Sequence, residues 1–137
     1  MADYFTNFIL ILPLPDKAAQ TYALDLAVKA GRIQQEDEST EHFPAPLIEA
    51  IELWHFETDP RDETGIWLHS ENGGIDAVCA FLQHLLQRFD PTGRVTFEWS
   101  NDCSQPRVDA YGGGAAIVTA TEIKTMSTGE WLQQNAA

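Results

Sequence analysis

The chain has 137 residues, and its 21 acidic and 8 basic side chains give a net charge of −13. The hydrophobic content of 44% is enough for one packed core, so we expect a single domain over residues 1–137. The excess of acids argues against direct binding to nucleic acid or to an anionic membrane, since both select basic surfaces. No apolar run approaches the ~20 residues of a membrane helix, and two cysteines are too few for a disulfide scaffold. We therefore expect a cytoplasmic protein.

The first expected element is a strand from Tyr4 to Leu12, which is rich in aromatic and β-branched residues and is followed by prolines. Asp16 is the expected N-cap of a helix whose apolar residues recur at helical spacing, and we expect Gly31 to end that helix. Residues 32–46 are polar and predict an acidic surface loop. A short helix of two turns is expected next, around residues 47–51.

The middle of the chain predicts a hairpin followed by a long helix. Two strand-like segments, Leu53 to Thr58 and Gly65 to Glu71, are separated by residues typical of turns. Asn72-Gly73-Gly74 then breaks the chain. The apolar residues from Ile75 to Phe89 follow the strongest helical spacing in the sequence.

The last part of the chain predicts two more strands. Arg94 to Ser100 alternates apolar with polar residues, which is typical of a half-buried strand. We expect a loop from Asn101 to Gly114 and a last strand from Ala115 to Ile123. One helical turn anchored by Trp131 precedes a tail that we expect to be frayed over residues 133–137.

This order of elements predicts an α+β fold. The first six major elements match a two-layer sandwich of the ferredoxin-like βαββαβ type, to which the last strand is added. Another two-layer α+β sandwich with a different strand order is the alternative.

Acidic residues are concentrated in the middle of the sequence. The 41 residues from Glu36 to Asp76 contain twelve acids and only one base, Arg61, and so carry 11 of the 13 net negative charges. Such asymmetry can steer a basic protein partner, although solubility alone is the simpler explanation. Trp67 is expected among these carboxylates on the outer sheet face, where it would anchor an interface. The residues expected to bind the partner are Glu36, Asp37, Glu38, Glu41, Glu57, Asp59, Asp62, Glu63, Trp67 and Glu71.

The same hairpin allows an alternative hypothesis, a metal site. Alternation along the two arms places His55, Glu57, His69 and Glu71 on the outer face, and a register with His55 across from His69 would bring two imidazoles and two carboxylates together. Such a site would indicate a metal-binding protein or a metal-dependent enzyme. A solvated sheet face on which His and Glu neighbours pair is the simpler explanation, and a register shift of one residue would separate the group.

Other motifs do not predict catalysis. Tyr111-Gly112-Gly113-Gly114 precedes a strand, and Asn72-Gly73-Gly74 lacks the Lys-Ser/Thr ending of a phosphate loop. Both glycine clusters therefore predict turns with positive φ. We expect a non-enzymatic protein without a cofactor.

The stretch from Trp67 to Ile123 contains a glycine-broken amphipathic helix, a Val-Thr-Phe-Glu-Trp strand and a Tyr-Gly-Gly-Gly-Ala strand. It resembles small proteins borne by plasmids and phages, among them the YubB-like group, which has a ferredoxin-like domain. The resemblance covers less than half of the chain; it implies a mobile-element origin and a small accessory role, and it carries over no catalytic residues. Several anti-defence proteins of mobile elements are small and acidic and bind host nucleases.

The leading hypothesis is therefore an acidic interaction protein that binds a basic protein. A nucleic-acid-mimicking inhibitor of a host defence nuclease, of the anti-CRISPR or anti-restriction type, is one such case by analogy. A structural homodimer formed through the outer sheet face is the third hypothesis.

Overall fold

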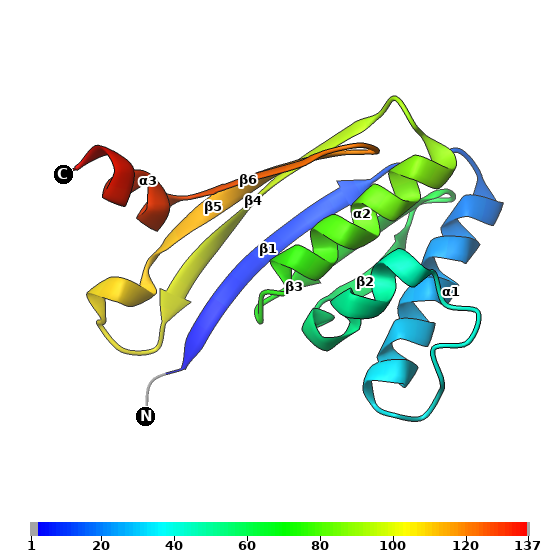
Figure 1. The fold of residues 1–137 in the computed structure, drawn as a ribbon, viewed down its shortest axis with the longest axis horizontal. Helices are drawn as coiled ribbons and strands as arrows, with labels where there is room; N and C mark the ends of the chain where they lie inside the picture. The colour runs from blue at the N-terminus through cyan, green and yellow to red at the C-terminus, as the bar shows by residue number, and fades with distance from the viewer. Residues whose placement is uncertain (1–2, 137) are drawn as a thin grey trace.

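The computed structural model describes residues 3–136, the side chain of Asp109 excepted. It has an α+β fold with a six-stranded antiparallel sheet in the order β2-β3-β1-β4-β5-β6 (Figure 1). The strands are β1 (Tyr4–Leu12), β2 (Glu57–Arg61), β3 (Gly65–Ser70), β4 (Arg94–Cys103), β5 (Gly112–Thr119) and β6 (Ile123–Ser127). The α-helices are α1 (Lys17–Gln34), α2 (Ile75–Phe89) and α3 (Thr128–Asn135), and the 3₁₀ helices are η1 (Ala45–Leu53) and η2 (Val108–Ala110).

The core lies between one face of the sheet and the helices α1 and α2, with η1 packed against both helices (Figure 1). Alternation along β1 buries Phe8, Leu10 and Leu12 against the helices and leaves Ile9 and Ile11 exposed on the opposite face. Helix α2 has the predicted bounds because its apolar residues keep helical spacing throughout, and seven of its 15 residues are buried.

Helix α1 begins as predicted but ends later. The Asp16 carboxylate caps it by accepting a hydrogen bond from the amide three residues on, at 2.8 Å. Gly31 lies inside the helix, so the prediction that it ends the helix is wrong. Ile33 packs against the core, and the Gln34 amide donates to the backbone carbonyls of Ile51 in η1 and Trp54 just after it, at 3.0 and 3.1 Å. These contacts extend the helix to Gln34, so the loop that follows it is shorter than the predicted loop at 32–46.

A buried glutamine ties α1 to the hairpin formed by β2 and β3. Gln20 is fully buried, and its Nε2 donates to the Gly65 carbonyl at 2.7 Å. Its Oε1 accepts from Lys17 Nζ at 2.6 Å. The side chain thus satisfies a backbone carbonyl at the start of β3 and holds the hairpin against the helix layer.

The hairpin begins later than predicted. Residues 54–56 follow η1 and belong to no strand, and β2 starts at Glu57. Trp54 and Phe56 nevertheless face the core: their rings stack at a centroid distance of 4.9 Å, and Trp54 lies 5.0 Å from Phe81 of α2. Packing against α2 places these aromatic residues, so their alternating pattern is not that of a strand.

The hairpin also turns later than predicted. Residues 59 and 60, expected in the turn, belong to β2. Pro60 has no amide hydrogen, but β2 is the edge of the sheet, where a proline is tolerated. The chain therefore reverses over residues 62–64, and Asp62 there has a left-handed φ of 55°.

The predicted last strand, Ala115 to Ile123, ends early, at Thr119 of β5, and a sixth strand that was not predicted, β6, follows a turn. β4 continues to Cys103 and β5 starts at Gly112, so the expected loop between them is shorter. A turn then follows Thr119, whose hydroxyl accepts from the Glu122 amide at 3.0 Å and whose own amide donates to the Glu122 carbonyl at 2.8 Å. Such hydroxyl-to-amide bonds favour a turn over continued strand.

The chain after β6 forms a helix in place of one anchored turn. Ser127 caps α3 by accepting from the Glu130 amide at 3.2 Å. Trp131 is 54% exposed, so the prediction that it anchors the tail is wrong. The tail expected to fray is helical as far as Asn135, and Ala137 lies outside the described residues.

Candidate functional site

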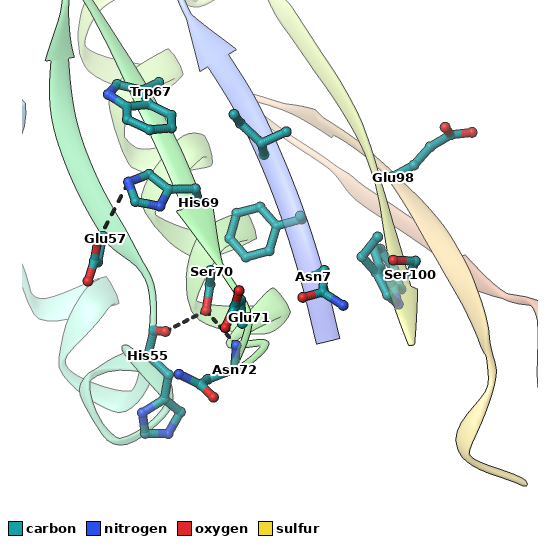
Figure 2. A pocket seen from close by; sticks show the side chains of 13 residues that line it. Asn7, His55, Glu57, Trp67, His69, Ser70, Glu71, Asn72, Glu98 and Ser100 are labelled. Atoms are coloured by element: carbon teal, nitrogen blue, oxygen red, sulfur yellow. Dashed lines mark hydrogen bonds and ion pairs between the residues drawn. The ribbon is translucent and has the colours of Figure 1, made fainter. Parts of the chain in front are cut away.

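The sheet face opposite α1 and α2 carries a groove of about 910 Å³ (Figure 2). Strands β1, β3 and β4 supply most of its lining, and the rest comes from the start of β2, the residue His55 before it and the two residues that follow β3. The lining residues are Asn7, Phe8, Ile9, His55, Glu57, Trp67, His69, Ser70, Glu71, Asn72, Glu98, Trp99 and Ser100. The groove thus combines aromatic and aliphatic groups with carboxylates, imidazoles and amides.

The strand register brings one imidazole and two carboxylates together at the β2 side of the groove. Glu57 lies directly opposite His69, and Asp59 lies opposite Trp67. His69 Nε2 is 2.8 Å from Asp59 Oδ2 and 3.7 Å from Glu57 Oε2. The Trp67 and His69 rings stack with centroids 4.0 Å apart and 20° between their planes, so the indole sets the plane of the imidazole.

The charges around the groove are predominantly negative. Glu57, Glu71 and Glu98 line it from three different segments. Over residues 3–136, no lysine or arginine lines the groove, and none forms an ion pair with Glu57 or Asp59. Carboxylates of one sign in a concave surface create a negative potential that attracts cations.

The four residues of the predicted metal site all line this groove, but only two of them come together. Glu57 and His69 belong to one cluster, whereas His55 and Glu71 lie outside it. The expected register, with His55 across from His69, is wrong because β2 begins at Glu57, which takes that position. The His55 imidazole lies beyond Ser70, whose hydroxyl donates to the His55 carbonyl at 2.7 Å (Figure 2).

The predicted partner-binding residues are spread over several parts of the surface. The four acids at 36–41 lie in the segment after α1, and those at 62 and 63 lie in the turn between β2 and β3. Glu38 already pairs with Lys29 and Arg32, at 3.8 and 3.9 Å. Asp59 belongs to the histidine cluster. The groove contains Glu57, Trp67 and Glu71 of the predicted set.

The sequence does not identify three residues of this face as metal ligands or groove residues. Its pattern predicts that Asp59 lies in the turn, because a strand that includes Pro60 is recognisable only once β2 is known to be an edge. Ile9 and Glu98 lie on the outer sides of β1 and β4. Alternation along both strands predicts that these two side chains face outward, but it does not predict that the two strands are neighbours.

Two groups with shifted pKa values belong to α2 and lie away from the groove. Burial raises the pKa of the Cys79 thiol to about 11, and the charge of Asp76 adds to the rise. Burial lowers the pKa of the His84 imidazole, and the positive charge of Arg88 adds to that effect. The Tyr22 hydroxyl of α1 lies 2.7 Å from His84 Nε2, so this histidine joins the two helices.

No protein-family model, curated protein or solved structure matches this chain.

None of the helices in the described part of the chain is both long and apolar enough to cross a membrane.

Proposed function

We propose that this protein acts by binding, and that the groove on the open sheet face receives a basic segment of a partner protein. The observation that carries the proposal is the arrangement of carboxylates on both sides of an apolar floor. Glu57 of β2 and Glu98 of β4 lie on opposite sides of Ile9 and Trp67. A ligand that places cations beside apolar side chains is complementary to this surface.

The apolar floor supplies the hydrophobic part of binding. Ile9 is 62% exposed and Ile11 is 49% exposed, although both belong to a central strand of the sheet. Ile117 of β5 is 41% exposed on the same face, but Thr96 of β4 lies opposite it and it does not line the groove. Covering such side chains removes apolar surface from water, at about 25 cal/mol per Å². Trp67 adds an aromatic group of the kind that anchors interfaces.

Arginine is the cation that fits the acidic side of the groove best. Its planar guanidinium forms paired hydrogen bonds with a carboxylate such as Glu57 and stacks on an aromatic face such as that of Trp67. Lysine would gain the charge attraction and single hydrogen bonds, but its ammonium cannot form the planar paired contact. We therefore expect the partner segment to carry arginine together with aliphatic residues. A second copy of this chain is a poorer partner, because a two-fold contact through this face would set one acidic groove against another.

Three broader inferences accompany this proposal. We infer that β1–β4, α1 and α2 form a ferredoxin-like unit, because β1 lies between β3 and β4 and β2 lies at the edge. We infer a cytosolic setting, which two free thiols support. Nucleic-acid-binding enzymes present grooves lined with lysine and arginine, so one specific form of the proposal is a protein from a mobile genetic element that inhibits a host defence nuclease.

The test uses a short fluorescein-labelled peptide of arginine and leucine, with binding followed by anisotropy. A peptide with citrulline in place of arginine keeps the shape of the side chain and removes its charge. The triple variant Glu57→Gln, Glu71→Gln, Glu98→Gln should bind the arginine peptide about threefold to a hundredfold more weakly than the unmodified protein. This magnitude follows from about 0.2–1 kcal/mol for each exposed ion pair.

A second triple variant controls for net charge. Glu36→Gln, Asp37→Asn and Glu41→Gln remove the same number of charges outside the groove. Its affinity for the arginine peptide should fall much less than that of the groove variant. An equal loss of affinity in both triple variants would show that the peptide is attracted by net charge alone. If the citrulline peptide binds as tightly as the arginine peptide, the carboxylates have no role in binding. The nuclease-inhibitor form is tested with a basic partner protein that this chain has captured. Double-stranded DNA should compete with this chain for binding to that partner.

A further inference from the structure

We propose that Glu57, Asp59 and His69 form a binding site for a divalent transition-metal ion at the β2 side of the groove. One ligand atom from each of these residues lies within 4.8 Å of the other two. This trio differs from the set predicted from the sequence, since Asp59 replaces His55 and Glu71. The metal site shares Glu57 with the proposed docking of a basic segment, but the docking also requires Glu71 and Glu98 and needs no metal.

The distances suit ligands of one ion. Ligands about 2.1 Å from a metal centre lie about 3.0 Å apart in octahedral and about 3.4 Å apart in tetrahedral geometry. His69 Nε2 is 2.8 Å from Asp59 Oδ2 and 3.7 Å from Glu57 Oε2. The three atoms lie within 4.8 Å of one another, so we expect rotation of the two acidic side chains to bring them around a common centre.

The backbone and the neighbouring ring hold these ligands in place. Glu57 and His69 are directly opposite residues of paired antiparallel strands, and Asp59 lies two residues along β2 on the same face. The Trp67 ring stacks on that of His69 at 4.0 Å and restricts rotation of the imidazole. A ligand whose plane is already fixed loses less conformational entropy when it binds a metal ion.

Charge and donor type indicate the kind of ion. Two carboxylates carry two negative charges, and in residues 3–136 neither has a lysine or arginine ion-pair partner. A divalent cation balances these charges when the imidazole is neutral. One nitrogen and two oxygen donors favour Zn²⁺, Mn²⁺ or Fe²⁺ over Mg²⁺, because imidazole is a poor ligand for hard cations. Coordination positions left by three protein ligands would open to the groove, where His69 and Glu57 are lining residues.

Titration calorimetry with ZnCl₂ on tag-free full-length protein tests the site, in a Cys103→Ser background that removes the partly exposed thiol. We expect one equivalent of Zn²⁺ to bind and MgCl₂ to give no comparable signal. His69→Gln and Asp59→Asn should each weaken Zn²⁺ binding by about tenfold or more. Two variants that remove neighbouring donors of the groove, His55→Gln and Glu71→Gln, should leave it unchanged.

Ring-proton NMR signals of the histidines supply a second measurement that does not depend on heats. On addition of Zn²⁺, the His69 signals should move and those of His55 should not. Retention of Zn²⁺ affinity in both His69→Gln and Asp59→Asn, an equal loss in His55→Gln, or absence of stoichiometric Zn²⁺ binding would each overturn the site. Circular dichroism confirms that each variant is folded. Glu98→Gln should lower the affinity for the arginine peptide and leave Zn²⁺ binding unchanged. The two proposals can therefore fail separately.

Discussion

Replacement of Gly114 with alanine should destabilise the sheet beneath the groove. Gly114 of β5 lies opposite Trp99 of β4, and the Trp99 indole occupies the space that a Cβ atom at residue 114 would need. The backbone carbonyl of Met126 closes the same space from β6. A methyl group there must displace the indole or separate the strands, at a cost of about 1–3 kcal/mol. For a chain of this length, Tm should fall by roughly 3–10 °C.

Thermal and urea denaturation followed by circular dichroism measure this change, and near-ultraviolet circular dichroism reports on the packing of the indole. Gly31→Ala is the matched control, because nothing lies within 4 Å of a Cβ at that position in α1. Removing a helix-interior glycine should stabilise the protein by about 0.5–1 kcal/mol. If Gly114→Ala unfolds at the same temperature and urea concentration as the unmodified protein, the Trp99 packing described above is incorrect.

Two further predictions concern helix α2. The lowered pKa of His84 means that the unfolded chain binds a proton that the folded chain does not, so stability should fall as the pH drops below about 6.5. His84→Gln, which keeps a hydrogen-bonding partner for the Tyr22 hydroxyl, should reduce this loss in urea titrations between about pH 7.5 and 5.5; an unchanged pH dependence would contradict the burial of the imidazole. Cys79 is buried with a raised pKa, so Ellman's reagent should modify Cys103 alone in the native protein and both thiols in denaturant. Rapid native modification of Cys79 in a Cys103→Ser variant would show that α2 opens.

Elements defined by their own periodicity were predictable from the sequence. The apolar spacing from residue 75 to 89 recurs without interruption, and this helix has the predicted bounds. Boundaries set by contacts with distant elements were not predictable. Gly31 would end an isolated helix, but contacts of the residues after it with the core and with η1 carry α1 onward. Trp54 and Phe56 alternate like strand residues because they both reach α2.

The candidate site shows the same division. Alternation along β3 predicts that Trp67 and His69 lie on the outer face. The structure confirms this, because Ile66 and Leu68, which alternate with them, are fully buried. The pairing partner of His69 depends on where β2 begins, and that depends on the packing of the aromatic residues before it. A shift of two residues exchanged His55 for Glu57 at this position and brought Asp59 into the cluster.

The two free edges of the sheet are unequal. Pro60 in β2 cannot donate a backbone hydrogen bond, and the acids Glu57 and Asp59 that precede it in the strand repel an approaching strand of like charge. The edge formed by β6 has no proline over Ile123–Ser127 and a single charged side chain, Lys124. Chain-to-chain strand addition, whether in a swapped dimer or in a fibril, is therefore less hindered at the C-terminal edge than at the edge beside the groove.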